Sequence, residues 1–204
     1  MTKISISNAS TIKHYLKLTL LLTIQFVVIY GGANWISTYR NDIHHIYFGW
    51  ERSIPLVPSM AWVYASIFPL MLMPPFYLDE GQLNRLAKQM ALAMAFAGAV
   101  FLLYPGTVGY DLAASPSRAI GFIRTIDLPY NTFPSLHVAL SAIVMLHLRP
   151  AMGTRGRALL ATWFIALVAS VILTHQHHFA DVLGAGLLVW FCRLFAHPAD
   201  DPHQ

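Results

Sequence analysis

Charge is scarce in this chain of 204 residues. Charged residues make up 11% of it and hydrophobic residues 56%, whereas soluble domains carry about 25% charged residues. This imbalance excludes an ordinary soluble domain and indicates a protein whose solvent is lipid. The length is enough for one domain, so we expect residues 1–204 to form a single membrane domain with its core over residues 14–197.

Two further absences narrow the class of protein. The formal net charge is +4, but no run of Lys and Arg is long enough to form the basic face that nucleic acid requires, so we expect no nucleic-acid partner. Cys192 is the single cysteine, which excludes an internal disulfide. The positive charges are better explained as topology signals and as candidates for binding phosphate.

Long apolar runs dominate what is present. A helix needs about 20 mostly apolar residues to cross the hydrocarbon layer of a bilayer. The first such run follows two lysines and could instead be a cleaved signal peptide, but it is longer than the apolar region of a typical signal. We expect an all-α integral membrane bundle of six transmembrane helices, near Leu18–Ile36, Val57–Tyr77, Leu86–Tyr104, Phe133–Leu148, Ala158–Thr174 and Phe179–Phe195.

The distribution of Lys and Arg predicts the orientation, because these residues accumulate in cytoplasmic loops. Nearly every residue with plausible chemistry then falls in the outer loops, and an ionisable cluster at a membrane is a functional hypothesis by default. We therefore expect a multi-pass protein of a bacterial inner (plasma) membrane whose site faces the periplasm or the outside. With cytoplasmic N- and C-termini, nine of the 13 Lys and Arg lie inside, and the others, Arg40, Arg52, Arg118 and Arg124, lie outside.

The first candidate motif is Asn131–Leu140, which reads NTFPSLHVAL. Proline suits the first turn of a helix, where its missing N–H costs nothing, so Pro134 predicts a helix start. The backbone N–H groups of Ser135 and its neighbours would then point outward and bind an anion. Ser135 adds a hydroxyl donor, and His137 adds an acid/base group one turn into the helix. The alternative is a helix cap with a core histidine bonded to a neighbour.

The second candidate motif is Ser170–Gly184, which reads SVILTHQHHFADVLG. His177 and Asp181 are four residues apart, so on a helix they share one face. A carboxylate bonded to one imidazole nitrogen fixes the tautomer and leaves the other nitrogen to attack. This arrangement predicts His177 as a nucleophile that Asp181 orients, with a pair that only anchors the helix as the alternative.

A metal site is a second possibility for the same tract. It also holds His175 and His178, and imidazole suits zinc. Adjacent histidines point in different directions on a helix, however, and no Cys or Glu completes the set. We therefore expect no metal and no other cofactor, with a metal-dependent membrane hydrolase as the alternative.

Taken together, the segments Phe133–His137 and His177–Asp181 resemble the second and third signature motifs of the type 2 phosphatidic acid phosphatase superfamily. The resemblance implies a six-helix membrane core that dephosphorylates lipid phosphates, or transfers their head groups, without a metal. Asp127–His137 (DLPYNTFPSLH) is especially similar to the branch related to inositol phosphorylceramide synthases. Glu51–Pro58 (ERSIPLVP) resembles the early segment of that branch.

Position by position, the resemblance implies a role for four residues. His177 would attack phosphorus, Asp181 would orient it, and His137 would protonate the leaving oxygen. Ser135 would help to hold the phosphoryl oxygens. Water, or the hydroxyl of another lipid, would then take the phosphoryl group from His177.

The chain departs from that superfamily in two places. The first motif, a Lys and an Arg-Pro pair, is not visible before the second helix, and Val171 stands where an Arg usually precedes the nucleophile by six residues. A phosphoryl transition state needs compensating cations or donors. We expect Arg124, Arg52 and Arg118 to bind substrate instead, Arg124 foremost because its loop leads to the Ser135 site. Each could instead be a surface or lipid-head-group contact.

The leading hypothesis is a metal-independent lipid phosphate phosphatase that acts through a phosphohistidine on a lipid phosphate or phospholipid. A head-group phosphotransferase with the same residues is the first alternative, because the motifs do not encode the acceptor. A non-catalytic transporter or lipid-binding protein is an alternative of another class. The missing cations favour it, and the intact His137, His177 and Asp181 oppose it. The sequence sets neither the lipid nor the oligomeric state.

Overall fold

The computed structural model describes residues 9–110, 117–126 and 129–196, and these residues form helices and loops without a β-strand. The all-α class predicted from the apolar runs is therefore confirmed. Short turns of other helical types join or precede the α-helices. They are the π-helical turn η1 (Val27–Gly31) and the 3₁₀ turns η2 (Gly49–Ser53), η3 (Pro58–Met60) and η5 (Arg149–Ala151). The helices are α1 (Ala9–Phe26), α2 (Gly32–Ser37), α3 (Ala61–Ala65), α4 (Ile67–Met71), α5 (Pro74–Tyr77), α6 (Glu80–Leu103), α7 (Arg118–Ile126), α8 (Leu136–Leu148), α9 (Thr154–Leu173) and α10 (Phe179–Ala196).

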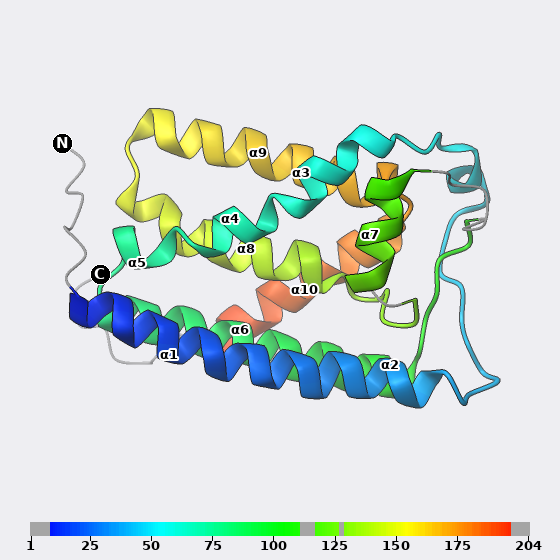
Figure 1. Ribbon diagram of the computed structural model, residues 1–204, viewed down its shortest axis with the longest axis horizontal. Helices are drawn as coiled ribbons and strands as arrows, with labels where there is room; N and C mark the ends of the chain where they lie inside the picture. The colour runs from blue at the N-terminus through cyan, green and yellow to red at the C-terminus, as the bar shows by residue number, and fades with distance from the viewer. Residues whose placement is uncertain (1–8, 111–116, 127–128, 197–204) are drawn as a thin grey trace.

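The helices run back and forth between two ends of the molecule (Figure 1). The chain passes from the end where α1 begins to the opposite end through α1 and α2, and returns through α3, α4 and α5. It then crosses by α6, α8, α9 and α10 in turn. The loops that carry the predicted chemistry, within residues 38–60, 104–110, 129–135 and 174–178, gather at the end where α2 stops.

Within the part of the chain that the structure describes, three helices are long and apolar enough to cross a membrane: Ala9–Ser37, Glu80–Leu103 and Thr154–Leu173. They coincide with the first, third and fifth predicted segments. The second predicted segment is broken into η3, α3, α4 and α5, because its prolines lack a backbone N–H and crowd the preceding turn. The fourth is a shorter apolar helix, Leu136–Ala151, and the sixth corresponds to the 18 residues of α10.

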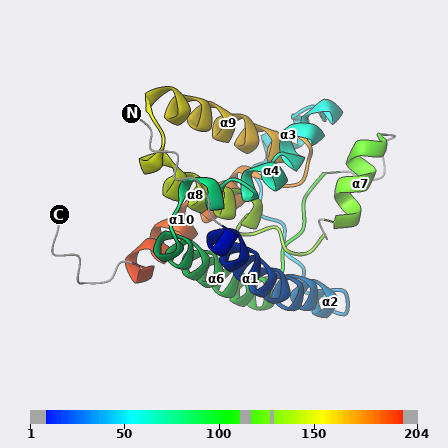
Figure 2. The same ribbon diagram turned by 60° about the vertical axis from the view of Figure 1, so that its left-hand side comes forward.

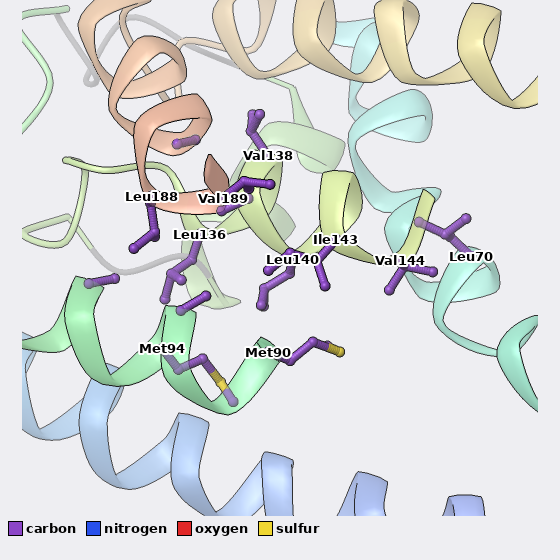
Figure 3. Close-up of a cluster of buried hydrophobic side chains, with 14 of the residues drawn as sticks. Leu70, Met90, Met94, Leu136, Val138, Leu140, Ile143, Val144, Leu188 and Val189 are labelled. Carbon is purple, nitrogen blue, oxygen red and sulfur yellow. The ribbon is translucent and has the colours of Figure 1, made fainter. Parts of the chain in front are cut away.

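The core lies where α6, α8 and α10 meet. Met90 and Met94 of α6 lie opposite Leu136 and Leu140 of α8, with Leu188 of α10 beside Leu136 (Figure 3). These side chains are buried in one continuous apolar cluster, and such burial stabilises a membrane bundle mainly through packing, since lipid is as apolar as the core. The cluster holds α8 and α10 in fixed register below the loops that precede them.

Helix α7 stands across the ends of the other helices rather than beside them (Figures 1 and 2). It contacts α3 and η3. Ile120 and Ile123 face inward and are buried, whereas Arg118 and Phe122 are exposed. An amphipathic helix in this position covers the end of the bundle where the loops gather.

Candidate active site

The turn between α9 and α10, residues 174–178, presents the histidines. The carbonyl of Val171 accepts hydrogen bonds from the N–H groups of Gln176 (3.1 Å) and His177 (3.0 Å), which folds the chain back over the end of α9. His175 adopts a φ of 60°, a left-handed conformation uncommon for a residue with a side chain. The tight turn therefore fixes the direction in which each histidine leaves the backbone.

The structure brings His177 and Asp181 together as the spacing predicted. The His177 Nδ1 and Asp181 Oδ2 atoms are 3.3 Å apart, and both side chains are buried. Only Asp181 lies on α10, in its first turn, while His177 precedes the helix. The same Oδ2 accepts the backbone N–H of His178 at 2.9 Å. Asp181 is thus held beside His177 by the backbone of the turn.

Ser135 is the N-cap of α8 and is completely buried. Its Oγ accepts the N–H of Val138 at 3.3 Å, and its own N–H donates to the Asp181 carbonyl at 3.1 Å. The prediction that the Ser135 N–H points outward toward an anion is therefore wrong. Pro134 also lies just before the cap and not in the first helical turn, because the cap position belongs to Ser135. The motif joins the start of α8 to the start of α10.

His137 is fixed by Tyr64, a residue of the broken second segment. Its Nε2 lies 2.9 Å from the Tyr64 carbonyl oxygen, and the two rings stack with their centres 3.9 Å apart. A carbonyl can only accept, so His137 Nε2 carries a proton. Proton exchange with a substrate would then occur at Nδ1.

His137 and His177 line the same cavity, which has a volume of about 420 Å³. Tyr30, Tyr64 and Asn131 also line it, and the remainder of its wall is almost entirely apolar. The apolar residues come from α1, α4, α6, α7 and α8, and include Leu18, Leu22, Phe26, Ile67, Phe68, Met71, Leu83, Leu86, Met90, Met94, Phe122, Ile123, Leu136 and Leu140. The site thus joins a pair of histidines to a space suited to hydrocarbon.

A second buried pair of histidine and carboxylate, His178 and Glu51, adjoins the first through the His178 N–H. Glu51 is completely buried, and its Oε2 lies 3.0 Å from the Nδ1 of His178 and accepts the N–H of Phe179 at 2.9 Å. Its Oε1 accepts the N–H of Phe48 at 2.8 Å. Burial alone would raise the pKa of Glu51, but these hydrogen bonds outweigh it and lower the pKa below its ordinary value. Sequence reasoning considered His178 only as a ligand of the alternative metal site, and Glu51 only as the first residue of the segment Glu51–Pro58.

Of the three predicted arginines, Arg124 is the one whose charge acts on a histidine of the turn, His175. It is half-buried on α7, and burial lowers its pKa. Burial is also the main cause that lowers the pKa of His175, and the charge of Arg124 adds to this effect. Arg52 and Arg118 are exposed, so the structure does not bring them into the buried cluster.

The histidine turn does not assemble a metal site. In the described parts of the chain, no three His, Cys, Asp or Glu side chains are grouped so that they could hold a metal ion. The histidines have different partners: His175 bonds to the Ile54 carbonyl, His177 to Asp181, and His178 to Glu51. The metal alternative therefore lacks a ligand set here.

Comparison with known proteins identifies a family. A model of the PAP2 superfamily matches residues 41–194, and no curated protein and no solved structure matches the chain. The matched region contains Glu51, both histidine motifs and the loops that position them. Because it covers well over half of the 204 residues, the chain belongs to the PAP2 superfamily.

Proposed function

We propose that the protein is a metal-independent phosphatase of lipid phosphates and that His177 carries the phosphoryl group. Members of the PAP2 superfamily are typically phosphatases or phosphotransferases. The observation that carries the proposal is the position of His177, which bonds to buried Asp181 and shares an apolar cavity with His137. The cavity supports the proposal of a lipid substrate, because its wall offers a hydrocarbon chain an apolar surface beside the reacting groups.

In the proposed first step, Nε2 of His177 attacks phosphorus while Nδ1 remains bonded to Asp181. An N–P bond forms, the P–O bond to the lipid breaks, and the Nδ1 proton of His137 passes to the leaving oxygen. The buried carboxylate of Asp181 stabilises the positive charge that develops on the ring. In the second step His137 takes a proton from water as the water oxygen attacks phosphorus. The N–P bond breaks and inorganic phosphate leaves.

We propose that Arg124 binds the phosphoryl oxygens. It would take the part of the arginine that the superfamily usually has at the position of Val171. It comes from α7, whose Phe122 and Ile123 line the cavity. Arg52 and Arg118 are exposed, and we assign them to contacts with the lipid head group at the protein surface. Ser135 would act through its cap of α8 and its bond to Asp181.

We further propose that the chain crosses the membrane six times, with both termini in the cytoplasm and the site outside. The proposal is supported by the elements that run between the two ends (Figure 1): α1 with α2, then α3 to α5, α6, α8, α9 and α10 would each make one pass. Arg85, Lys88, Arg149, Arg155 and Arg157 lie near the end where α1 begins, which fits a cytoplasmic face. The histidine turn lies at the other end.

The test is phosphate release by the purified protein in detergent, with EDTA present, across a panel of lipid phosphates. We expect wild type to release phosphate and His177→Ala to lose all turnover, because the residue that carries the phosphoryl group is gone. A phosphoenzyme that is stable to base and labile to acid should form in wild type alone. Normal turnover by His177→Ala, or activity that EDTA abolishes, would overturn the proposal.

The second candidate is a head-group phosphotransferase, which the similarity of Asp127–His137 to the branch related to inositol phosphorylceramide synthases favours. Such an enzyme would form the same phosphohistidine and pass the group to a lipid alcohol. Phosphoenzyme without phosphate release, followed by turnover when a lipid alcohol is added, would identify it. Absence of phosphoenzyme with every lipid would favour a non-catalytic lipid-binding protein.

A further inference from the structure

Glu51 and His178 form a buried network that reaches the proposed nucleophile. His178 is 1% exposed and Glu51 is 0% exposed, so neither is in contact with solvent. A buried carboxylate persists as an ion only when its oxygens are paired. Both oxygens of Glu51 are engaged by the N–H donors described above. The fold therefore holds the Glu51–His178 pair through several hydrogen bonds and not through a single contact.

The hydrogen bonds of His178 decide which of its nitrogens carries the proton. The backbone N–H of Gly109 donates to Nε2 at 2.9 Å, so Nε2 must be unprotonated. Nδ1 then carries the proton and donates it to Glu51 at 3.0 Å. Burial lowers the pKa of His178, which agrees with a neutral ring. Both nitrogens are occupied, so His178 is unsuited to attack phosphorus.

The backbone connects this pair to Asp181. The N–H of His178 donates to the same Asp181 oxygen that faces His177. Glu51 anchors residues 178 and 179 through the His178 ring and the Phe179 N–H, and Tyr47 and Tyr110 stack on that ring at 5.0 and 4.4 Å. The titratable groups around His178 include Glu51, Asp181, His177, His175, Tyr47 and Tyr110.

We propose that Glu51 and His178 are positioning residues that hold Asp181, and through it His177, in the geometry for attack on phosphorus. This inference rests on the proposed function and assigns the pair no contact with substrate. A carboxylate that only packed the fold would affect stability alone. A positioning carboxylate instead affects the chemical step, because small displacements of a nucleophile are costly in rate.

Glu51→Gln is the sharpest variant, because it preserves shape and replaces one accepting oxygen by a donating amide. Both carboxylate oxygens of Glu51 accept hydrogen bonds from N–H groups, so the amide NH₂ of the introduced glutamine would face one of these N–H donors without an acceptor between them. We expect kcat to fall about 10- to 100-fold, the range found for residues that orient the ligands of a metal, with KM nearly unchanged. The matched control is Glu80→Gln, an exposed carboxylate at the other end of the molecule that bonds to Ser10. Equal kcat values for the two variants would overturn the proposal.

A double-mutant cycle tests whether the two residues act as one unit. If they do, Glu51→Gln combined with His178→Asn should reduce kcat no more than the larger single effect. Thermal unfolding of each variant shows whether the fold is retained. Fully additive losses in kcat would contradict a shared role.

A measurement without substrate separates this inference from the proposed function. We would record ¹⁵N spectra of the imidazole rings in histidine-labelled protein in detergent, assigned with His178→Asn and His177→Ala. We expect His178 to remain neutral with its proton on Nδ1 below pH 6.5, and Glu51→Gln to shift the His177 signals. An ordinary titration of His178, or unaltered His177 signals, would overturn the inference even if the enzyme is active. If the panel gives no activity, these spectra still decide the positioning role.

Discussion

At the scale of single residues, the partners of each imidazole assign different chemistry to histidines that the sequence presents alike. His177 faces a carboxylate with one nitrogen, and His178 has both nitrogens bonded. His137 has its Nε2 fixed by a carbonyl, which directs proton exchange to Nδ1. We therefore propose three different roles for these histidines: nucleophile for His177, positioning residue for His178 and acid for His137.

If His137 is the acid, as we propose, turnover should depend on the leaving group. His137→Gln can still donate an amide N–H to the Tyr64 carbonyl but provides no acid. We expect phosphoenzyme formation from an alkyl phosphate to slow by about 10²- to 10⁴-fold, the usual contribution of general acid catalysis. An aryl phosphate, whose leaving oxygen needs no proton, should react nearly as fast as with wild type. Rapid-quench measurement of the phosphoenzyme makes the comparison, and equal losses with both substrates would exclude this role.

At the scale of elements, the site depends on a close contact between α10 and the loop before α8. A Cβ atom on Gly184 would lie 2.5 Å from the ring of Phe133, which is too close. This contact adjoins the hydrogen bond from Ser135 to Asp181 that joins the two helix starts. Glycine at this position lets the two histidine motifs approach each other.

The contact makes a matched pair of substitutions on one helix informative. We expect Gly184→Ala to destabilise the protein by about 1–3 kcal/mol through overpacking, and to lower kcat because Asp181 moves with α10. Gly186→Ala meets nothing within 4 Å, so it should be neutral or stabilise by about 0.5–1 kcal/mol through helix propensity. Thermal unfolding and phosphate release measure both effects. A Gly184→Ala protein as stable and active as Gly186→Ala would show that the contact is not tight.

The elements also show which parts of the structure the sequence could predict. The helical class and the contact between His177 and Asp181 depend on local periodicity and a spacing of four residues, which are visible in the chain. Glu51 and His178 are 127 residues apart, and a lone Glu before an apolar segment gives no sign of that partner. The break in the second segment was signalled by Pro58, Pro69 and Pro74, but its apolar composition suggested one helix. Tertiary contacts also decided where the Ser135 N–H points.

At the scale of the whole molecule, the cavity depends on segments from most of the chain. Helix α1 contributes one wall along its length, from Tyr15 to Phe26, and α6 and α8 contribute others. Between these two residues α1 rises about 16 Å, at 1.5 Å per residue. A cavity of that reach, with His137 and His177 in its wall, suits a lipid whose phosphate lies at the histidines and whose chain extends along α1.

This arrangement predicts that α1 selects the chain length of the substrate. Leu18 lies in the cavity wall, whereas Leu20 on the same helix is 61% exposed and does not line the cavity. We expect Leu18→Trp to lower kcat/KM for long-chain lipid phosphates by tenfold or more, about 1.4 kcal/mol of lost binding, and to leave short-chain substrates nearly unaffected. Leu20→Trp should behave as wild type throughout a series of increasing chain length. Leu18→Trp fills space along α1 away from the histidines and leaves the histidines in place. An equal loss of kcat/KM for short-chain and long-chain substrates would therefore mean that the hydrocarbon chain of the lipid binds elsewhere.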